Sequence, residues 1–279
     1  MDPKQAAISI AMFAFVLSSM IGMGLGLRVA EIVAPLRNWR LVILPLVANF
    51  VVMPLAAIAL ARMMRLDESL GVGLLLLGAA SGAPFLPKLA QVAHANLAFA
   101  VGLMVLLMVI TVGYVPIVLP FLLPGVSVNP AHIARSLVLL MLLPLGAALA
   151  LNANRPQTAA RAKPAFDKVS NVSLIVLIAL LTLLNVKSVV AVFGTGGIFA
   201  GILFLAAGFA VGWGLGGPKK DTRSVLGLGT AQRNIAAALV VATQSFDDPN
   251  VVVMVVVVAV VGLLILMPLS RALAAHAAA

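Results

Sequence analysis

Nine apolar stretches, each close to the length that crosses a bilayer, follow one another through almost the whole chain. Only 9% of the 279 residues are charged, whereas a soluble domain has about 25%. Backbone polar groups in lipid must be bonded internally, and the polar–apolar alternation of a transmembrane β-barrel is missing. We therefore predict an all-α polytopic membrane protein with about nine transmembrane helices. The spans are expected at residues 8–27, 41–61, 70–93, 97–123, 131–151, 165–186, 196–217, 222–246 and 250–269.

Lysine and arginine are distributed unevenly among the short connections between these spans. Of the 18 Lys and Arg residues, 12 fall on the side of the C-terminus, 5 fall on the side of the N-terminus, and Arg233 lies inside a span. The positive-inside rule therefore predicts that the N-terminus is outside and the C-terminus is in the cytoplasm. This rule also accounts for the net charge of +10, so nucleic acid is not an expected partner. Short loops without added domains favour a plasma membrane, specifically a bacterial inner membrane.

The span at 222–246 is polar in its middle, where an apolar helix would be expected. Arg233 lies near its centre, and a charge at the bilayer midplane costs about 2.5–3.5 kcal/mol on insertion scales. We predict that Gly227 and Gly229 break the helix just before it. A polar, interrupted span is typical of the binding site of a transporter. Alternatively, Arg233 holds helices together by bonding backbone carbonyl groups.

The span at 70–93 is also expected to be interrupted. Pro84 and Pro87 follow Gly82 closely, and each proline removes a backbone donor and clashes with the preceding turn. The two interrupted spans run in opposite directions, and each precedes a long, smooth apolar span. This pattern indicates two inverted repeats, which we place at 1–123 and 131–279, with two discontinuous helices that cross.

Four segments resemble the bile acid:sodium symporter family. They are GMGLGL at 22–27, NFVVMPLAA at 49–57, the broken third span with the span after it, and QRNIAAAL at 232–239. The resemblance extends over nearly the whole chain, in order and at similar spacing. It implies a core domain (spans 2–4 and 7–9) with the two broken helices crossing at the bilayer midplane, and a panel domain (spans 1, 5 and 6). The substrate would lie between the domains and cross by alternating access.

The positions that hold sodium in that family differ here. Sodium-coupled members have a glutamate before the amide-rich break, and our alignment puts Gly227 at that position. The family's ligands in the third span fall at Leu86 and Pro87, and those of the next span fall in 102–108, which contains no hydroxyl group. Asn49 alone is retained in kind. The resemblance therefore implies the fold of a sodium symporter without most of its sodium ligands.

Two cationic side chains, Lys88 and Arg233, stand near these positions instead. We predict that they replace two bound sodium ions and, with the positive N-terminal ends of the broken helices, attract a small organic anion. Lys88 also has an ordinary interpretation, because it lies near the inner end of its span and could reach the interface. A buried Lys88 could release a proton, which keeps proton coupling as an alternative. The predicted substrate-binding residues are Arg233, Lys88, Asn234, Gln232, Asn49, Thr230 and Ser81.

The favoured function is a sodium-independent secondary transporter of an organic anion. Two alternatives stay open: a sodium-coupled symporter of a bile-acid-like or pantoate-like anion, and a passive uniporter or channel. An enzyme is not predicted, because the chain has no HExxH motif, no paired intramembrane aspartates, and no serine with a mid-span histidine. No cofactor or metal site is predicted, and the absence of cysteine excludes iron–sulfur clusters and thiolate sites. The lipid bilayer and the anion are the expected partners.

Overall fold

The computed structural model describes residues 3–28, 30, 39–123, 129–184, 192 and 194–278, and all regular structure in these residues is helical. Residues 185 and 186, the end of the sixth predicted span, lie outside the described residues. The elements are α1 (Pro3–Gly26), α3 (Arg40–Val47), η2 (Ala48–Val52), α4 (Met53–Met63), α5 (Glu68–Ala79), α6 (Leu86–Val92), α7 (Leu97–Leu122), α8 (Pro130–Leu137), η3 (Val138–Leu142), α9 (Leu143–Asn154), α10 (Pro156–Leu184), α12 (Gly197–Leu215), α13 (Lys220–Ala231), α14 (Ile235–Ser245) and α15 (Pro249–Ala278).

The described residues contain seven helical segments that are long and apolar enough to cross a membrane. Their positions agree with seven of the predicted spans, which confirms an all-helical, polytopic membrane protein. The other two predicted spans coincide with α5 together with α6, and with α10. The seven segments are residues 6–26, 40–63, 97–122, 130–154, 197–215, 220–245 and 249–275.

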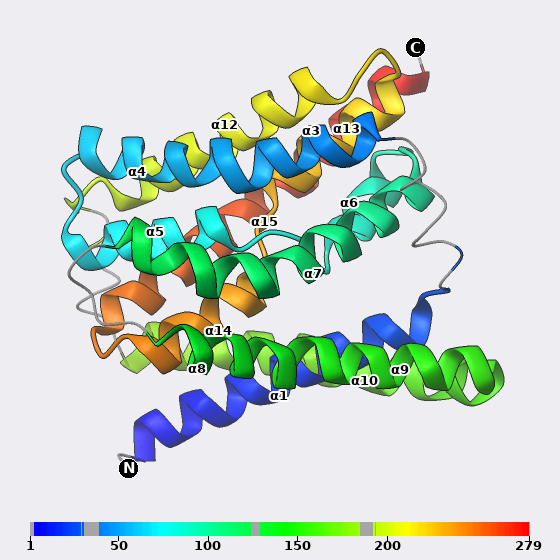
Figure 1. Ribbon diagram of the computed structural model, residues 1–279, viewed down its shortest axis with the longest axis horizontal. Helices are drawn as coiled ribbons and strands as arrows, with labels where there is room; N and C mark the ends of the chain where they lie inside the picture. The colour runs from blue at the N-terminus through cyan, green and yellow to red at the C-terminus, as the bar shows by residue number, and fades with distance from the viewer. Residues whose placement is uncertain are drawn as a thin grey trace.

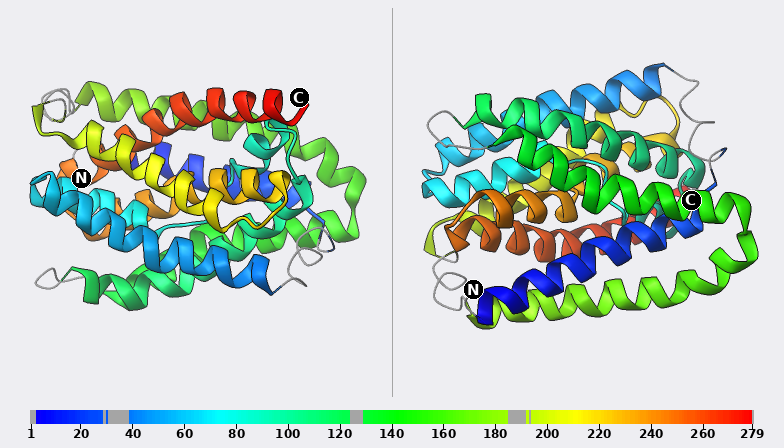
Figure 2. Two further views of the ribbon diagram at one scale, coloured as in Figure 1. Left: turned by 90° about the horizontal axis from the view of Figure 1, so that it is seen from above. Right: turned by 60° about the horizontal axis from the view of Figure 1, so that its bottom comes forward.

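The helices form two layers (Figures 1 and 2). One layer contains α1, α8, η3, α9 and α10, and the other contains α3 to α7 and α12 to α15. In the first layer α1 packs along both α9 and α10. The glycines of the GMGLG segment allow this approach, since a Cβ atom on Gly24 would lie 2.6 Å from the carbonyl oxygen of Leu145 and 2.7 Å from Cβ of Ala148.

Two π-helical turns, η2 and η3, each precede a proline near the start of the next α-helix, Pro54 and Pro144 respectively. A proline cannot donate to the carbonyl four residues earlier, and its ring crowds that carbonyl. For Pro54 the carbonyl belongs to Phe50, and the Tyr114 hydroxyl of α7 donates to it over 2.6 Å. The wider turn of η2 also contains Asn49, which faces the interior of the second layer and is fully buried.

Two of the predicted spans are interrupted in the middle, as expected. Helix α5 ends at Ala79 and α6 begins at Leu86, so residues 80–85 form the first break. Helix α13 ends at Ala231 and α14 begins at Ile235, so residues 232–234 form the second break. The backbone amide of Asn234 donates to the carbonyl oxygen of Ala80 over 3.0 Å, which joins the two breaks directly.

Candidate functional site

The first break passes close to the backbone of α7. Gly82 has φ +82°, and a Cβ atom there would lie 2.2 Å from the backbone nitrogen of Met108. Only glycine fits this position, because both the backbone angle and the space exclude a side chain. Pro84 lies inside the break and Pro87 lies in the first turn of α6, where its missing N–H group has no helical partner to lose. Gly82 and Pro84 thus lie inside the first break and Pro87 just after it, and the roles predicted for them in shaping the break stay a prediction.

The second break is not made by glycines. Gly227 and Gly229 both lie inside α13, before its last residue Ala231, so the prediction that they break the helix is wrong. They are packing positions instead. A Cβ atom on Gly227 would lie 3.0 Å from the ring of Phe209, and one on Gly229 would lie 2.9 Å from Cδ2 of Leu86. The two glycines therefore let α12 and α6 approach α13 closely.

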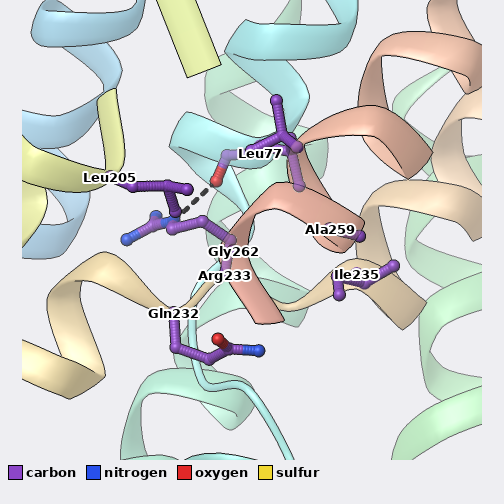
Figure 3. Close-up of a pocket in the computed structure, with 8 residues that line it drawn as sticks. Leu77, Leu205, Gln232, Arg233, Ile235, Ala259 and Gly262 are labelled. Carbon is purple, nitrogen blue, oxygen red and sulfur yellow. Dashed lines mark hydrogen bonds between the residues drawn. The ribbon is translucent and has the colours of Figure 1, made fainter. Parts of the chain in front are cut away.

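Arg233 is 3% exposed, and its guanidinium group binds four oxygen atoms from three segments of the chain. Nε donates to the carbonyl oxygen of Leu77 over 2.8 Å (Figure 3), and Nη2 donates to that of Gly78 over 2.6 Å. Nη1 donates to Oδ1 of Asn49 over 2.7 Å and to the carbonyl oxygen of Thr230 over 3.1 Å. Four of its five N–H groups are thereby used. The alternative interpretation of Arg233, that it bonds backbone carbonyls, is the arrangement observed.

The carbonyl groups that Arg233 binds lie at the C-terminal ends of two half-helices. Leu77 and Gly78 belong to the last turn of α5, and Thr230 belongs to the last turn of α13. Such carbonyls have no helical donor and carry the negative end of the helix dipole. The guanidinium group therefore occupies a place where partial negative charges from two helices meet. Chemically, it is a covalently attached cation in a cage of oxygen atoms.

Asn49 connects the three segments of this cage. Its Oδ1 atom accepts from Ser81 Oγ over 2.8 Å as well as from Arg233. Its Nδ2 group donates to the carbonyl oxygen of Pro45 over 2.9 Å and to Thr230 Oγ1 over 3.2 Å. All the hydrogen-bonding capacity of this amide is used. The structure thus brings together Asn49, Ser81, Thr230 and Arg233, all four of which are buried.

Asn234 joins the second break to the first. Its Nδ2 group donates to the carbonyl oxygens of Ser81 over 3.3 Å and Gly82 over 3.1 Å. Its Oδ1 atom accepts from the backbone amide of Ala237 over 3.0 Å, which caps the N-terminus of α14. Asn234 is completely buried. It therefore acts as a bridge between the two interrupted helices, and its predicted contact with substrate stays a prediction.

Gln232 differs from its neighbours, because its side chain has no hydrogen bond to any described residue although it is only 4% exposed. It lines a small cavity together with Arg233, Leu77 and Leu205. In Figure 3 its amide group points away from the guanidinium group of Arg233. The cavity volume is about 10 Å³, which is about enough for one water molecule. Gln232 is thus the predicted site residue whose polar atoms are still available.

Lys88 does not join the cluster around Arg233. It lies on α6 with an exposed side chain, and its ammonium group donates to Oε1 of Gln91 over 3.3 Å. The structure therefore places Arg233, but not the side chain of Lys88, at the crossing of the broken helices, where both were expected to replace bound sodium ions. Its exposed position agrees with the ordinary interpretation of a lysine near the inner end of a span. The predicted contact of Lys88 with the substrate stays a prediction.

Thr111 of α7 belongs to the site but was missed by sequence reasoning. Its hydroxyl group accepts from the backbone amide of Ser81 over 2.9 Å and donates to the carbonyl oxygen of Ser81 over 3.0 Å. The hydroxyl ligands of this span were expected at 102–108, and Thr111 follows that segment. A polar residue in the middle of the otherwise apolar α7 was the available signal. Thr111 thus binds the backbone of Ser81, whereas Asn49 binds the Ser81 side chain.

The described residues contain no cluster of three or more His, Asp or Glu side chains that could hold a metal ion. Lys163 and Asp167 on α10 form an ion pair, but it lies in the other layer and is partly exposed. Arg233 therefore has no carboxylate partner among the described residues. A buried cation without an acidic partner attracts negative charge from its surroundings, because the dielectric constant of the interior is low.

Comparison with known proteins gives one family. The model of the sodium bile acid symporter family matches residues 13–192, which is more than half of the chain. This range begins inside α1, contains α3 to α10 with the first break and Asn49, and ends before the second break with Arg233. A search of curated proteins finds no match.

Proposed function

The chain belongs to the sodium bile acid symporter family, and on this premise we propose that it is a secondary transporter that carries a small organic anion without sodium. The observation that carries this proposal is the cage of oxygen atoms around Arg233. A bound sodium ion also needs several oxygen ligands, and here one guanidinium group holds the carbonyl oxygens of Leu77, Gly78 and Thr230. The fixed cation would make a bound one unnecessary.

We place the substrate site beside the crossing of the two breaks, between the two layers. The charge of Arg233 favours an anion there, and Gln232 supplies the free amide that would contact it. Asn49, Ser81, Thr230 and Asn234 would then hold the breaks in shape rather than bind substrate directly, because their polar groups already bond one another and the backbone. Lys88 would act from the exposed face of α6.

The architecture that goes with this function has nine spans in two inverted repeats. The first repeat would be residues 1–123 and the second residues 131–279, so that α5 and α6 correspond to α13 and α14. In both cases a long apolar helix follows, α7 or α15. The layer of α1, α8, α9 and α10 would be the panel domain and the other layer the core. The charge distribution supports a plasma membrane location with the N-terminus outside.

The test is uptake into proteoliposomes by the purified protein. Radiolabelled organic anions from small hydroxy acids to bile salts would be offered with an inward gradient of sodium, potassium or choline. We expect saturable uptake of at least one anion at equal rates in all three salts. Uptake that requires sodium would overturn the sodium-independent account, and the absence of uptake for every anion would overturn the choice of substrate class.

A variant that leaves the helix breaks intact is needed to connect uptake to the site. Gln232→Ala removes an amide group that has no hydrogen bond within the described chain, so it should not destabilise the protein. We expect it to reduce uptake about tenfold or more, which corresponds to about 1.4 kcal/mol of lost substrate interaction. Ser245→Ala, at the other end of α14, is the matched control and should transport normally. Equal uptake by both variants would show that Gln232 does not contact the substrate.

A further inference from the structure

A small cavity borders Arg233 inside the second layer. Its volume is about 10 Å³, and it is lined by Arg233 and Gln232 of the second break, by Gly262, and otherwise by apolar side chains (Figure 3). The lining residues come from the second break and from α5, α12, α14 and α15, all of which belong to this layer. The cavity is therefore distinct from the proposed substrate site between the layers. At this volume it has room for one water-sized particle and none for an organic anion.

Both polar residues that line the cavity have hydrogen-bond donors left over. Nη2 of Arg233 carries two N–H groups, and the described chain gives it one acceptor, the carbonyl oxygen of Gly78. The amide group of Gln232 has no partner in the described chain, although this side chain is only 4% exposed. Buried polar groups are almost always hydrogen-bonded, because a donor that loses its hydration without gaining a partner is unfavourable. The cavity thus suits an occupant that accepts hydrogen bonds.

The charge of Arg233 favours an anion over a water molecule as this occupant. A guanidinium group stays protonated in proteins, and a charge is unfavourable in the low-dielectric interior unless an opposite charge is near. The four oxygen atoms around Arg233 belong to neutral groups, as does the ring of Phe204, whose centroid lies 5.9 Å from Cζ. Their dipoles reduce the cost of burial but do not cancel the charge. A water molecule would accept a hydrogen bond, whereas only an anion would also neutralise Arg233.

We propose that this cavity is a binding site for one small inorganic anion of the size of chloride. Chloride is only slightly larger than a water molecule, and it accepts hydrogen bonds without a fixed geometry. The ion would be a resident of the second layer and not the transported anion. By neutralising Arg233 it weakens the attraction of the crossing for an organic anion. This last consequence rests on the proposed function, whereas the binding site itself does not.

The site can be tested without a transported substrate. The purified wild-type protein would be heated in detergent in sodium chloride, sodium bromide or sodium gluconate at equal ionic strength, so that the cation is constant. We expect both halides to raise the apparent melting temperature by several degrees over gluconate, in a way that saturates with concentration. Crystals soaked in sodium bromide should show an anomalous scattering peak in the cavity. Equal melting in all three salts, or bromide peaks only elsewhere, would overturn the site.

Gly262→Ala tests the location by filling the cavity. The added Cβ atom would lie 3.6 and 3.7 Å from the Cδ atoms of Leu205, which is ordinary van der Waals contact, so the variant should fold. Gly262 and Leu205 both line the cavity, so the new methyl group takes up its space. We expect this variant to melt at the same temperature in all three salts. Gly214→Ala on α12 is the matched control, since no atom lies within 4 Å of its added Cβ, and it should keep the halide response. A halide response that Gly262→Ala retains would overturn the location.

Gln232→Glu tests the chemistry of the site at nearly constant shape. The carboxylate replaces the amide donors and repels an anion, so the half-saturating chloride concentration should rise at least tenfold. Each variant is compared with itself in gluconate, so a change in its basal stability does not affect the result. An unchanged half-saturating concentration would show that Gln232 does not bind the ion and would contradict the proposal.

Uptake measurements separate failure of this site from failure of the proposed function. If an anion of the uptake panel is transported, the wild type should take it up severalfold faster in gluconate than in chloride, and Gly262→Ala should transport it equally in both. Stabilisation by halides without transport of any organic anion would leave the site in place and remove the proposed function. Transport at equal rates in both salts, with no stabilisation by halides, would remove the site and leave the proposed function in place.

Discussion

The two breaks in the helices have the same position in their spans but opposite chemistry. The first break, with the end of α5, presents carbonyl oxygens: those of Leu77, Gly78, Ala80, Ser81 and Gly82 all accept bonds from the second break. The second break presents donors, which are the guanidinium group of Arg233 and the backbone and side-chain N–H groups of Asn234. Each break therefore satisfies groups that the other leaves without a helical partner.

This difference explains why one break contains glycine and proline and the other contains polar side chains. The first must run against the backbone of α7 at Met108, which Gly82 permits. The second needs only three residues, because its side chains stabilise the open turn by bonding across the crossing. The comparison shows that a helix in a membrane can be interrupted without glycine or proline. At the second break, bonds to the first break stabilise the interruption.

Arg233→Ala should have the largest effect on this arrangement. It leaves the carbonyl oxygens of Leu77, Gly78 and Thr230 buried without a donor, at about 1–3 kcal/mol for each. We expect a large fall in the apparent melting temperature, measured in detergent by size-exclusion chromatography after heating. Lys88→Ala is the control and should melt like the wild type, because Lys88 is exposed. Equal melting of the Arg233 variant and wild type would show that the cage does not hold the breaks together.

Gly82→Ala tests the backbone requirement of the first break. The added Cβ atom would lie 2.2 Å from the nitrogen of Met108 and would force a left-handed backbone angle on alanine. Overpacking and backbone strain together predict a loss of about 2–5 kcal/mol. Gly113→Ala on α7 is the matched control, since no atom lies within 4 Å of its added Cβ. If both variants have the same stability, the close approach of residues 80–85 to α7 is wrong.

Asn234→Ala separates bridging from helix capping. The variant loses the cap on Ala237 and both bonds to the first break, so we expect a loss of about 2–4 kcal/mol. Asn96→Ala is the comparison, because Asn96 caps α7 through Phe99 alone and should cost about 1 kcal/mol. Thermal unfolding of the two variants side by side measures the difference. A loss of stability no larger than that of Asn96→Ala would show that Asn234 stabilises the protein only as a helix cap.

Gly227→Ala should have the smallest effect. The added Cβ would lie 3.0 Å from the ring of Phe209, which is the end of a side chain that can shift. Alanine also favours the helix by about 1 kcal/mol over glycine, so the net change should be within about 1 kcal/mol of zero. Circular dichroism and thermal unfolding would measure it. A loss as large as that of Gly82→Ala would show that Phe209 cannot shift to admit the added Cβ.

The sequence predicted the elements well, because spans of about twenty apolar residues can hardly fold otherwise in a membrane. The first break was also predictable, since Gly82 and Pro84 disfavour a helix by their own geometry. The position of the second break was predicted only approximately, because Gly227 and Gly229 were taken as its cause. Residues 232–234 leave the helix because of bonds to a distant segment.

The composition of the site was predicted in part for the same reason. Asn49, Ser81, Thr230 and Arg233 stood out as polar residues in apolar spans, and the structure brings them together. Lys88 was predicted to replace a sodium ion because it follows Leu86 and Pro87, which align with sodium ligands, but its side chain is exposed on α6. Sequence position fixes which helix a residue is on and not which way the residue faces after a break.

The central claim is that the guanidinium group of Arg233 takes the place of a bound cation. The most direct measurement is the thermal stability of the purified wild-type protein in sodium chloride and in choline chloride at equal ionic strength. A protein that binds sodium gains about 2.7 kcal/mol when sodium is present at about 100 times its dissociation constant. We predict the same apparent melting temperature in both salts. Stabilisation that is specific to sodium and grows with its concentration would contradict the account, because it would require a sodium site that Arg233 does not fill.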